Sequence, residues 1–328
     1  MIIETKSEVD ENEWNSLLEQ DGKSVFKTFE WSKFTSDNPH YLIATENGKL
    51  VGVMHFREDK VLFRKALVSD SLPVAKDEKT KVEILRNFMK LRVMKIINTT
   101  YQDDKYSSLA TKAGFKFTDK STVIVDLKKI DVSLKSLDKK RRYDLNKAVK
   151  EGAEVVDSTK NLHDWEEFYD IYQRAGKEWG IKILDKAKFM KFKELSSHNL
   201  AKLFLVNTNG KPVSGSIVLN SGNTAIFFIN ATDPRSNHAH TNSLLVWENL
   251  TYAKKNGFEY FDLFGYDMHA KPNEKTYGIN KFKLSFGGEV KKFHKFTDSS
   301  LFVNARKVYN KIRPIKKAYF LLQRFGNI

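Results

Sequence analysis

Cysteine is absent from the 328 residues of this chain, and there are only six prolines. The absence of cysteine excludes disulfides, thiol nucleophiles and zinc–thiolate sites, and it is typical of a protein of the reducing cytoplasm. Apolar runs also stay well short of the roughly 20 residues that a membrane-spanning helix needs. The first residues, Met1 to Lys6, lack the basic and apolar regions of a signal peptide. We therefore expect a soluble, cytoplasmic protein.

Several common enzyme signatures are missing as well. The sequence has no Walker lysine loop, no Gly-x-Gly-x-x-Gly after a strand, no Gly-x-Ser-x-Gly elbow and no His-Glu-x-x-His helix. Eight histidines include one close pair, His238 and His240, but no further ligand is spaced to complete a metal site. We expect neither a metal nor a bound cofactor.

Positive charge and aromatic residues are plentiful. Lysine and arginine number 56 against 41 acids, which gives a formal net charge of +15, and there are 24 Phe and 12 Tyr. The charge attracts polyanions such as RNA, nucleotide phosphates or an anionic membrane surface, although evenly spread lysines also form an ordinary solvated surface. The aromatic content supplies a core, and the length favours two domains.

Two hairpin patterns share the same turn chemistry. Asn47–Lys49 and Asn209–Lys211 both read Asn-Gly-Lys between apolar runs, which is a strong hairpin signal. Each is followed later by a helix closed by a glycine, Gly114 or Gly257, and then by a strand. Such turns are common, but the matching order favours two similar α/β units in tandem.

A basic helix is predicted between these units. Over residues 137–152, its apolar face would hold Leu137, Leu145 and Val149. The cations outside this face are Lys139, Lys140, Arg142, Lys147 and Lys150. Two interpretations stay open, a phosphate-binding helix and a solvated face.

A second basic stretch runs from Ser300 to Phe325, interrupted by Pro314. Its pattern fits a terminal helix docked on the core, an interfacial membrane helix or an RNA-contacting tail.

One lysine stands among aromatic residues late in the chain. Phe261–Gly265 predicts a buried strand that delivers a glycine-bounded loop, and Phe282–Gly288 predicts a second strand that carries Lys283. Desolvating an ammonium costs several kcal/mol or lowers its pKa. Lys283 therefore indicates a site for an anionic or developing negative group, or for proton transfer.

A polar loop, 231–242, leads from a strand into a helix that begins near Ser243. A helix N-terminus in this setting can bind an anion through free backbone N–H groups. In Gcn5-related acetyltransferases the coenzyme A pyrophosphate lies at such a loop, which is usually rich in glycine. This loop has no glycine, which weakens the case for ordinary acetyl-coenzyme A use.

The order of these segments resembles the Fem family of aminoacyl-tRNA-dependent peptidyltransferases, in its compact form without a coiled-coil arm. The segments that carry the resemblance are Phe29–Phe34, the basic helix from Lys139, Gly180–Ile181, Asn209–Lys211, Asn242 before 244–248, Phe261–Gly265 and Phe282–Gly288. The resemblance implies an α/β (α+β) fold of two tandem Gcn5-related acetyltransferase-like domains with mixed central sheets. We expect these domains at 1–132 and 133–297, the second with the catalytic cleft, and a basic C-terminal helix at 298–328.

The same resemblance implies transfer of an amino acid from aminoacyl-tRNA to an amine of a peptidoglycan-type peptide precursor. In that reaction the Lys283 cation would stabilise a tetrahedral oxyanion, and the Phe282 carbonyl would help to hold the reacting groups. The implied substrate-binding residues are Trp31, Lys33, Lys182, Asn242, Asp262, Gly265 and Tyr266, and the implied tRNA or phosphate contacts are Lys139, Lys140, Arg142 and Lys147.

The implied partners are aminoacyl-tRNA and a nucleotide- or lipid-linked cell-wall precursor. We expect a monomer, with a peripheral contact to the inner face of the membrane through the basic C-terminal helix.

The chain also departs from the Fem pattern. Lys182 stands where members acting on nucleotide-linked precursors carry an arginine, and Asn98 stands where many relatives have an Asp-Pro. Two other functions therefore stay open. One is an acyl-coenzyme A-dependent N-acyltransferase that acts on an amino sugar or other small amine. The other is a non-catalytic RNA- or membrane-surface protein on the same scaffold.

Overall fold

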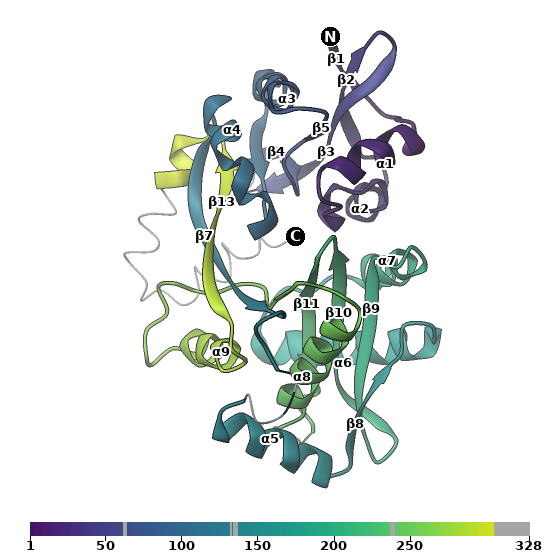
Figure 1. Ribbon diagram of the computed structural model, residues 1–328, viewed down its shortest axis with the longest axis vertical. Helices are drawn as coiled ribbons and strands as arrows, with labels where there is room; N and C mark the ends of the chain where they lie inside the picture. The colour runs from purple at the N-terminus through teal and green to yellow at the C-terminus, as the bar shows by residue number, and fades with distance from the viewer. Residues whose placement is uncertain (62–63, 132, 134–136, 237–239, 305–328) are drawn as a thin grey trace. The chain divides into compact units, whose positions relative to one another are not determined.

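A computed structural model of the chain describes residues 1–61, 64–131, 133, 137–236 and 240–304. The chain forms two compact units (Figure 1). The first unit comprises Met1–Ser121 and the segment from Lys292 onward, and the second comprises Thr122–Lys291. Two long strands, β7 (Lys116–Asp126) and β13 (Glu289–Thr297), begin in one unit and end in the other.

A mixed sheet forms the centre of the first unit. Its strands follow the order β1 (Ile2–Lys6), β2 (His40–Glu46), β3 (Lys49–Val61), β4 (Arg64–Ser69), β6 (Met94–Ile97) and β13, and the short β5 (Val74–Ala75) pairs with β3. Strands β4 and β6 are parallel, and the other pairs are antiparallel.

Helices cover both faces of this sheet because successive side chains of a strand point to opposite sides. The helices are α1 (Glu11–Gln20), α2 (Phe29–Thr35), α3 (Glu78–Lys90) and α4 (Ser107–Lys112), with 3₁₀ turns at Val25–Lys27 and Tyr101–Tyr106. Leu42 of β2 packs in one cluster with Ile84 of α3, whereas its neighbour Tyr41 packs in another with Trp14 of α1.

The second unit repeats this plan. Its strands follow the order β7, β12 (Tyr260–Asp262), β11 (Thr224–Thr232), β10 (Lys211–Ser221), β9 (Ala201–Thr208) and β8 (Ala153–Asp157), with only β11 and β12 parallel. The helices are α5 (Lys139–Lys150), α6 (Leu162–Trp179), α7 (Lys186–Ser197), α8 (Thr241–Lys255) and α9 (Lys275–Leu284).

Helices α8 and α6 lie on opposite faces of this second sheet, α8 in front of the strands and α6 behind them in Figure 1. Two adjacent residues of β10 face opposite sides of the sheet, and each packs against one of these helices. Ser216 accepts a hydrogen bond from Asn249 of α8, at 2.5 Å. A Cβ placed on Gly215 would lie 2.7 Å from Phe168 of α6. Packing on each face fixes the register, because a shift of one residue would exchange the two faces.

The two predicted hairpins are confirmed. Asn47 and Gly48 connect β2 to β3 with φ of 52° and 77°, and Asn209 and Gly210 connect β9 to β10 with φ of 52° and 72°. Positive φ at both central residues is the requirement of the tight turn that Asn-Gly favours. The repeated turn therefore does mark equivalent positions in the two units.

Two details of the prediction are wrong. Phe282 and Lys283 lie at the end of helix α9 and not on a strand, since the next strand, β13, begins only at Glu289. Val149 does not share the buried face of α5, because its side chain is 58% exposed. The residues of α5 that turn inward are Arg141, Asp144, Leu145 and Ala148.

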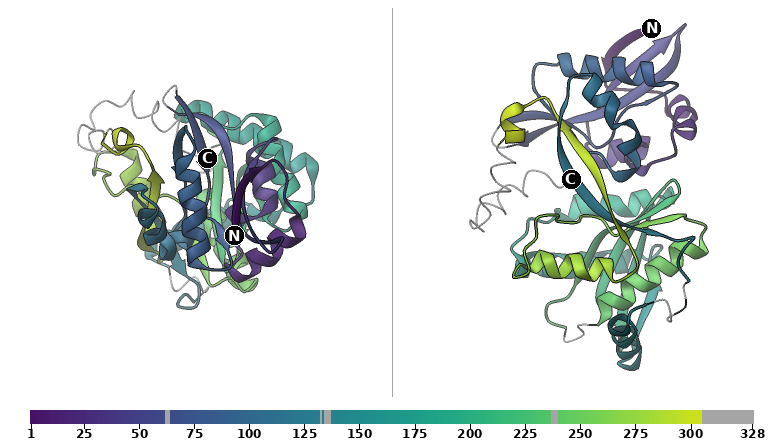
Figure 2. Two further views of the ribbon diagram at one scale, coloured as in Figure 1. Left: turned by 90° about the horizontal axis from the view of Figure 1, so that it is seen from above. Right: turned by 60° about the vertical axis from the view of Figure 1, so that its left-hand side comes forward.

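The basic C-terminal helix, expected over 298–328, lies mostly outside the described residues, of which 300–304 are helical. Figure 2 shows this short helical piece in yellow beside the first unit's strand β13. Within the described ranges, no helix combines the length and the apolar character needed to cross a membrane.

A buried group of charges holds together separate pieces of the first unit. The Lys27 ammonium lies 2.8 Å from Asp21 at the end of α1 and 2.9 Å from Asp103 in the second 3₁₀ turn. Lys81 of α3 forms a further ion pair with Asp21. All four side chains are buried, so each charge depends on its partners for the solvation that it loses.

Replacement of Lys27 by Met is therefore expected to destabilise the protein by about 3–5 kcal/mol, because two buried carboxylates lose a shared cation. Denaturant unfolding measures the loss. The matched control is Lys23→Met, which removes an exposed pair with Glu19 and should leave the midpoint unchanged. Equal effects of the two substitutions would contradict the structural role of the buried group.

Candidate functional site

The site begins where β12 ends, at Asp262. This side chain is only 4% exposed, because β12 lies between β7 and β11 in the sheet. Its Oδ1 accepts a hydrogen bond from the backbone N–H of Phe264 at 2.8 Å and another from the hydroxyl of Thr122 on β7. Burial raises the pKa of Asp262 to about 6, against the opposing effects of these two donors and of Lys283.

A strained turn follows this carboxyl. Phe264 and Gly265 both have positive φ, 49° and 75°. Gly265 adopts this conformation easily, but a bulky residue such as Phe264 seldom does. Such strain persists only where neighbouring contacts hold it, and it is concentrated at functional sites. Here the Phe264 N–H is held by Asp262, and its carbonyl is held by Lys283.

Lys283 reaches this turn from the last turn of α9. Its ammonium donates to the carbonyls of Phe264 and Gly265, the latter at 2.6 Å. Burial lowers the pKa of Lys283 to about 8, while the nearby Asp262 carboxylate opposes that shift. At neutral pH the side chain is therefore mostly a cation, though one that can lose its proton more readily than an ordinary lysine.

The number of donors on Lys283 suggests what it can do. An ammonium has three N–H donors. Among the described residues only the two turn carbonyls accept from it. The third donor is available to a substrate oxygen, and a fixed cation of this kind can stabilise negative charge that develops during acyl transfer.

A second polar cluster lies at the start of α8, and its main member, Arg141, is not among the predicted site residues. Arg141 of α5 donates to Ser243 Oγ at 2.8 Å and pairs with Asp144 at 3.0 Å. Asp144 Oδ1 lies 2.9 Å from Nδ1 of His240. The guanidinium of Arg141 also stacks over the ring of Phe282, 5.0 Å from its centre.

This cluster connects α5, α8 and α9 within the second unit. The spacing of Arg141, Asp144, Leu145 and Ala148, at positions i, i+3, i+4 and i+7, could have revealed it, because residues with that spacing share one helix face.

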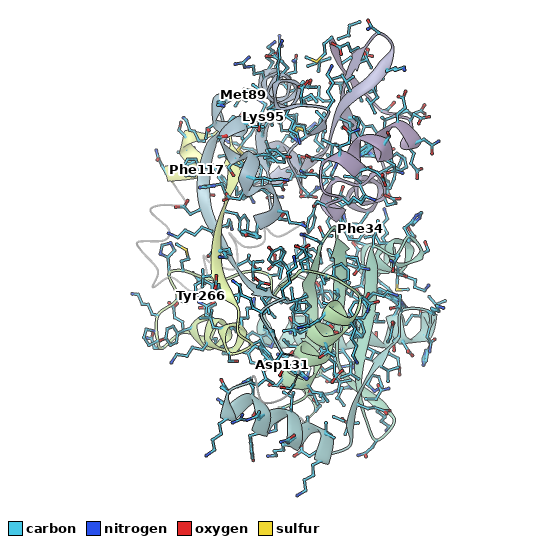
Figure 3. The ribbon with its side chains drawn as sticks, in the orientation of Figure 1. Phe34, Met89, Lys95, Phe117, Asp131 and Tyr266 are labelled. Atoms are coloured by element: carbon cyan, nitrogen blue, oxygen red, sulfur yellow. The ribbon has the colours of Figure 1, made fainter. Side chains whose placement is uncertain are left out.

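The structure brings together three of the predicted site residues, Asp262, Gly265 and Lys283. Tyr266, the residue after Gly265, packs against the core of the second unit. Its label in Figure 3 lies near α9. The Phe282 carbonyl accepts hydrogen bonds from the N–H and hydroxyl of Ser285, at the end of α9.

The other predicted residues of the second unit lie elsewhere on it. Asn242 is in the first turn of α8, where its Oδ1 accepts from Asn230 at 3.3 Å. Lys182 is exposed between α6 and α7. On α5, the predicted phosphate contacts are exposed or partly exposed; they are Lys139, Lys140, Arg142 and Lys147.

Trp31 and Lys33 belong to α2 of the first unit. Trp31 is 1% exposed, and its indole N–H donates to Asp70 at 3.3 Å. Lys33 is exposed, and its ammonium lies 5.3 Å from the ring centre of Phe29. Trp31 therefore packs in the core, while Lys33 faces solvent.

The described residues contain no group of three or more side chains that could bind a metal ion. Of the histidine pair noted in the sequence, His238 lies outside the described residues, and His240 takes part in the Asp144 cluster.

Replacement of Asp262 by Asn tests the coupling of this carboxyl to the lysine. The loss of the negative charge should lower the pKa of Lys283 below about 8, because the carboxylate now stabilises the charged ammonium. Amine-selective labelling of Lys283 at a series of pH values, read by peptide mass spectrometry, gives the midpoint. Thr122→Val is the control that keeps the carboxyl and should shift the midpoint less. An unchanged or higher midpoint in Asp262→Asn would refute the coupling.

Comparison with known proteins agrees with this fold. Residues 139–272 match the family model described as an acetyltransferase (GNAT) domain. The crystal structure of FemX is similar, with 15% identity and a TM-score of 0.71, covering 94% of this chain and 99% of FemX. L-PGS from Bacillus licheniformis is also similar, with 12% identity and a TM-score of 0.64, covering 92% and 96% of the two chains.

A tandem GNAT protein from the clavulanic acid biosynthesis pathway matches with 13% identity and a TM-score of 0.54, covering 90% of this chain and 98% of that protein. No curated protein matches the sequence. At these identities the similarity establishes the fold, which is α/β with two tandem GNAT-type units, as the sequence predicted.

Proposed function

We propose that this protein is an aminoacyltransferase that moves an amino acid from aminoacyl-tRNA to an amine of a cell-wall peptide precursor. The observation that carries the proposal is the Lys283 ammonium, which two turn carbonyls fix in place and which keeps one donor for a substrate oxygen. The structural similarity to FemX supports it, as does the resemblance of the Phe282–Gly288 segment to the Fem family.

The chemistry is a direct transfer. The acceptor amine attacks the ester carbonyl carbon, a C–N bond forms, and the carbonyl oxygen becomes an oxyanion. Collapse of this intermediate breaks the bond to the ribose oxygen, and that oxygen takes up the proton that the amine gives up. In this scheme Lys283 stabilises the oxyanion. Asp262 fixes the Phe264–Gly265 turn through the Phe264 N–H, and the carbonyls of that turn position the Lys283 ammonium. The reaction needs no covalent enzyme intermediate.

Surface charge supports a polyanionic donor. The chain carries a net charge of +15, and five cations of α5 are exposed or partly exposed, namely Lys139, Lys140, Arg142, Lys147 and Lys150. Phosphate contacts of this kind supply most of the affinity for RNA and make it dependent on salt. We assign Lys139, Lys140, Arg142 and Lys147 to this role.

The acceptor is a nucleotide- or lipid-linked precursor in this proposal. In the second unit, Lys182 is an exposed cation that suits its diphosphate, and Asn242 and Tyr266 are the polar groups that we assign to the substrate. In the first unit, we assign the exposed Lys33 to substrate binding. We further propose that the protein acts as a monomer in the cytoplasm, with peripheral contact to the inner face of the membrane.

A second candidate function is supported by the match of residues 139–272 to the acetyltransferase (GNAT) model. On this alternative, the same cation stabilises the oxyanion of an acyl-coenzyme A thioester, and the acceptor is an amino sugar or another small amine. Thermal unfolding with each donor separates the two functions. Stabilisation by acetyl-coenzyme A, with no response to charged tRNA, would favour this alternative.

Replacement of Lys283 by Met tests the main proposal. We expect the rate of aminoacyl transfer from charged tRNA to fall about 100- to 1000-fold, as on removal of an oxyanion donor, with little change in tRNA affinity. Lys281→Met is the matched control, because Lys281 is an exposed lysine of the same helix and should leave the rate unchanged. The proposal fails if the native protein releases no free tRNA with any charged tRNA and amine acceptor.

A further inference from the structure

The chain contains three Asn-Gly bonds, which follow Asn47, Asn209 and Asn256, and the proposed function uses none of them. Asparagine before glycine is chemically labile in a peptide, because glycine carries no side chain to hinder its backbone nitrogen from attacking the asparagine amide carbon. Two of these bonds are the repeated hairpin turns, and the third directly follows helix α8. All three asparagines are exposed. They differ in what the neighbouring backbone groups bind.

In the two hairpin turns the attacking nitrogen is not held. Gly48 and Gly210 are exposed, and no backbone carbonyl of the described residues accepts a hydrogen bond from the N–H of either glycine. This is a property of the tight turn, in which the two central residues stand outside the strand ladder. Each glycine nitrogen can therefore approach the preceding side chain without first breaking a hydrogen bond to a carbonyl.

Asn256 has the opposite surroundings. The N–H of Gly257 donates to the Lys254 carbonyl at 3.1 Å, as is usual after the end of a helix. The side-chain amide of Asn256 donates to the Tyr252 carbonyl at 2.9 Å, which holds the amide carbon in place. Both hydrogen bonds must break before the nitrogen can reach that carbon. Two bonds of ordinary strength reduce the population of the reactive geometry by about tenfold.

We propose that Asn47 and Asn209 are sites of spontaneous deamidation, one in each unit, and that the native fold protects Asn256. The glycine nitrogen forms a C–N bond to the asparagine Cγ and gives up its proton, and the side-chain nitrogen leaves as ammonia. The product is a cyclic imide. Water then opens this ring at one of its two carbonyl carbons, which leaves either aspartate or isoaspartate. The reaction needs water and no other reactant.

Isoaspartate alters the turn as well as its charge. It routes the backbone through the side-chain carbon, so one extra methylene enters a turn whose length sets the strand register. At position 209 the turn connects β9 to β10. Gly215 and Ser216 of β10 pack against opposite helices, so a change of register there weakens both faces of the second sheet. We therefore expect the unfolding temperature to fall as isoaspartate accumulates.

Ageing of the full chain in mildly alkaline buffer tests this assignment. Peptide mass spectrometry measures the conversion of each amide to a carboxyl group, and an isoaspartate-specific methyltransferase identifies the rearranged product. In the native protein Asn47 and Asn209 should react about tenfold faster than Asn256. In denaturant, where the hydrogen bonds at Asn256 are lost, the three rates should converge.

Asn209→Asp is the matched control, because it introduces the new charge without the extra methylene. It keeps an Asp-Gly pair that also favours the tight turn, so its unfolding temperature should stay close to that of the unaged protein. A fall as large as that of the aged protein would contradict the change in register.

Equal rates at the three sites in the native protein would overturn the assignment, as would a reaction confined to the denatured chain. Faster reaction at Asn256 than in either hairpin would also overturn it. None of these outcomes bears on aminoacyl transfer, because deamidation requires neither the donor nor the acceptor of that reaction.

Discussion

The Lys283 ammonium occupies its position because two successive carbonyls, those of Phe264 and Gly265, accept its hydrogen bonds. Both residues must adopt left-handed backbone conformations for this turn, at a cost of about 1–3 kcal/mol for a bulky residue such as Phe264. The hydrogen bond from the Phe264 N–H to Asp262 offsets that cost. The position of the cation, the exposure of the Phe264 ring and the protonation of Asp262 therefore depend on one another.

The sheet explains why the Asp262 carboxyl, which accepts from the Phe264 N–H of this turn, is so deeply buried. Strand β12 is three residues long and pairs on one side with β7 and on the other with β11. Asp262 is its last residue, so the sheet removes the carboxyl from water just before the chain leaves for the loop. Burial brings its pKa up to about 6 and that of Lys283 down to about 8. Both groups are therefore mostly charged only between these two pKa values, an interval of pH that includes neutrality.

The sequence was sufficient wherever structure is set by neighbouring residues. The Asn-Gly hairpins are an example, because positive φ at both positions is a local requirement. Helix α9 was missed for the opposite reason. It contains Gly278, it lacks a side-chain cap at Glu274, and its aromatic end reads equally well as a short strand. The contact of Asp262 with Lys283, and the inward turn of Arg141, depend on tertiary packing that no local pattern encodes.

The cations of this chain serve different roles. The group that each cation contacts determines its role. Lys27 and Arg57 are buried against carboxylates, which cancel their fields, so these cations serve stability. Lys283 donates to two carbonyl oxygens, which satisfy two of its three donors and carry no net charge, although the buried Asp262 carboxylate lies near it. Its field therefore remains available to a substrate. A net charge of +15 cannot distinguish these cases, but the acceptor beside each lysine does.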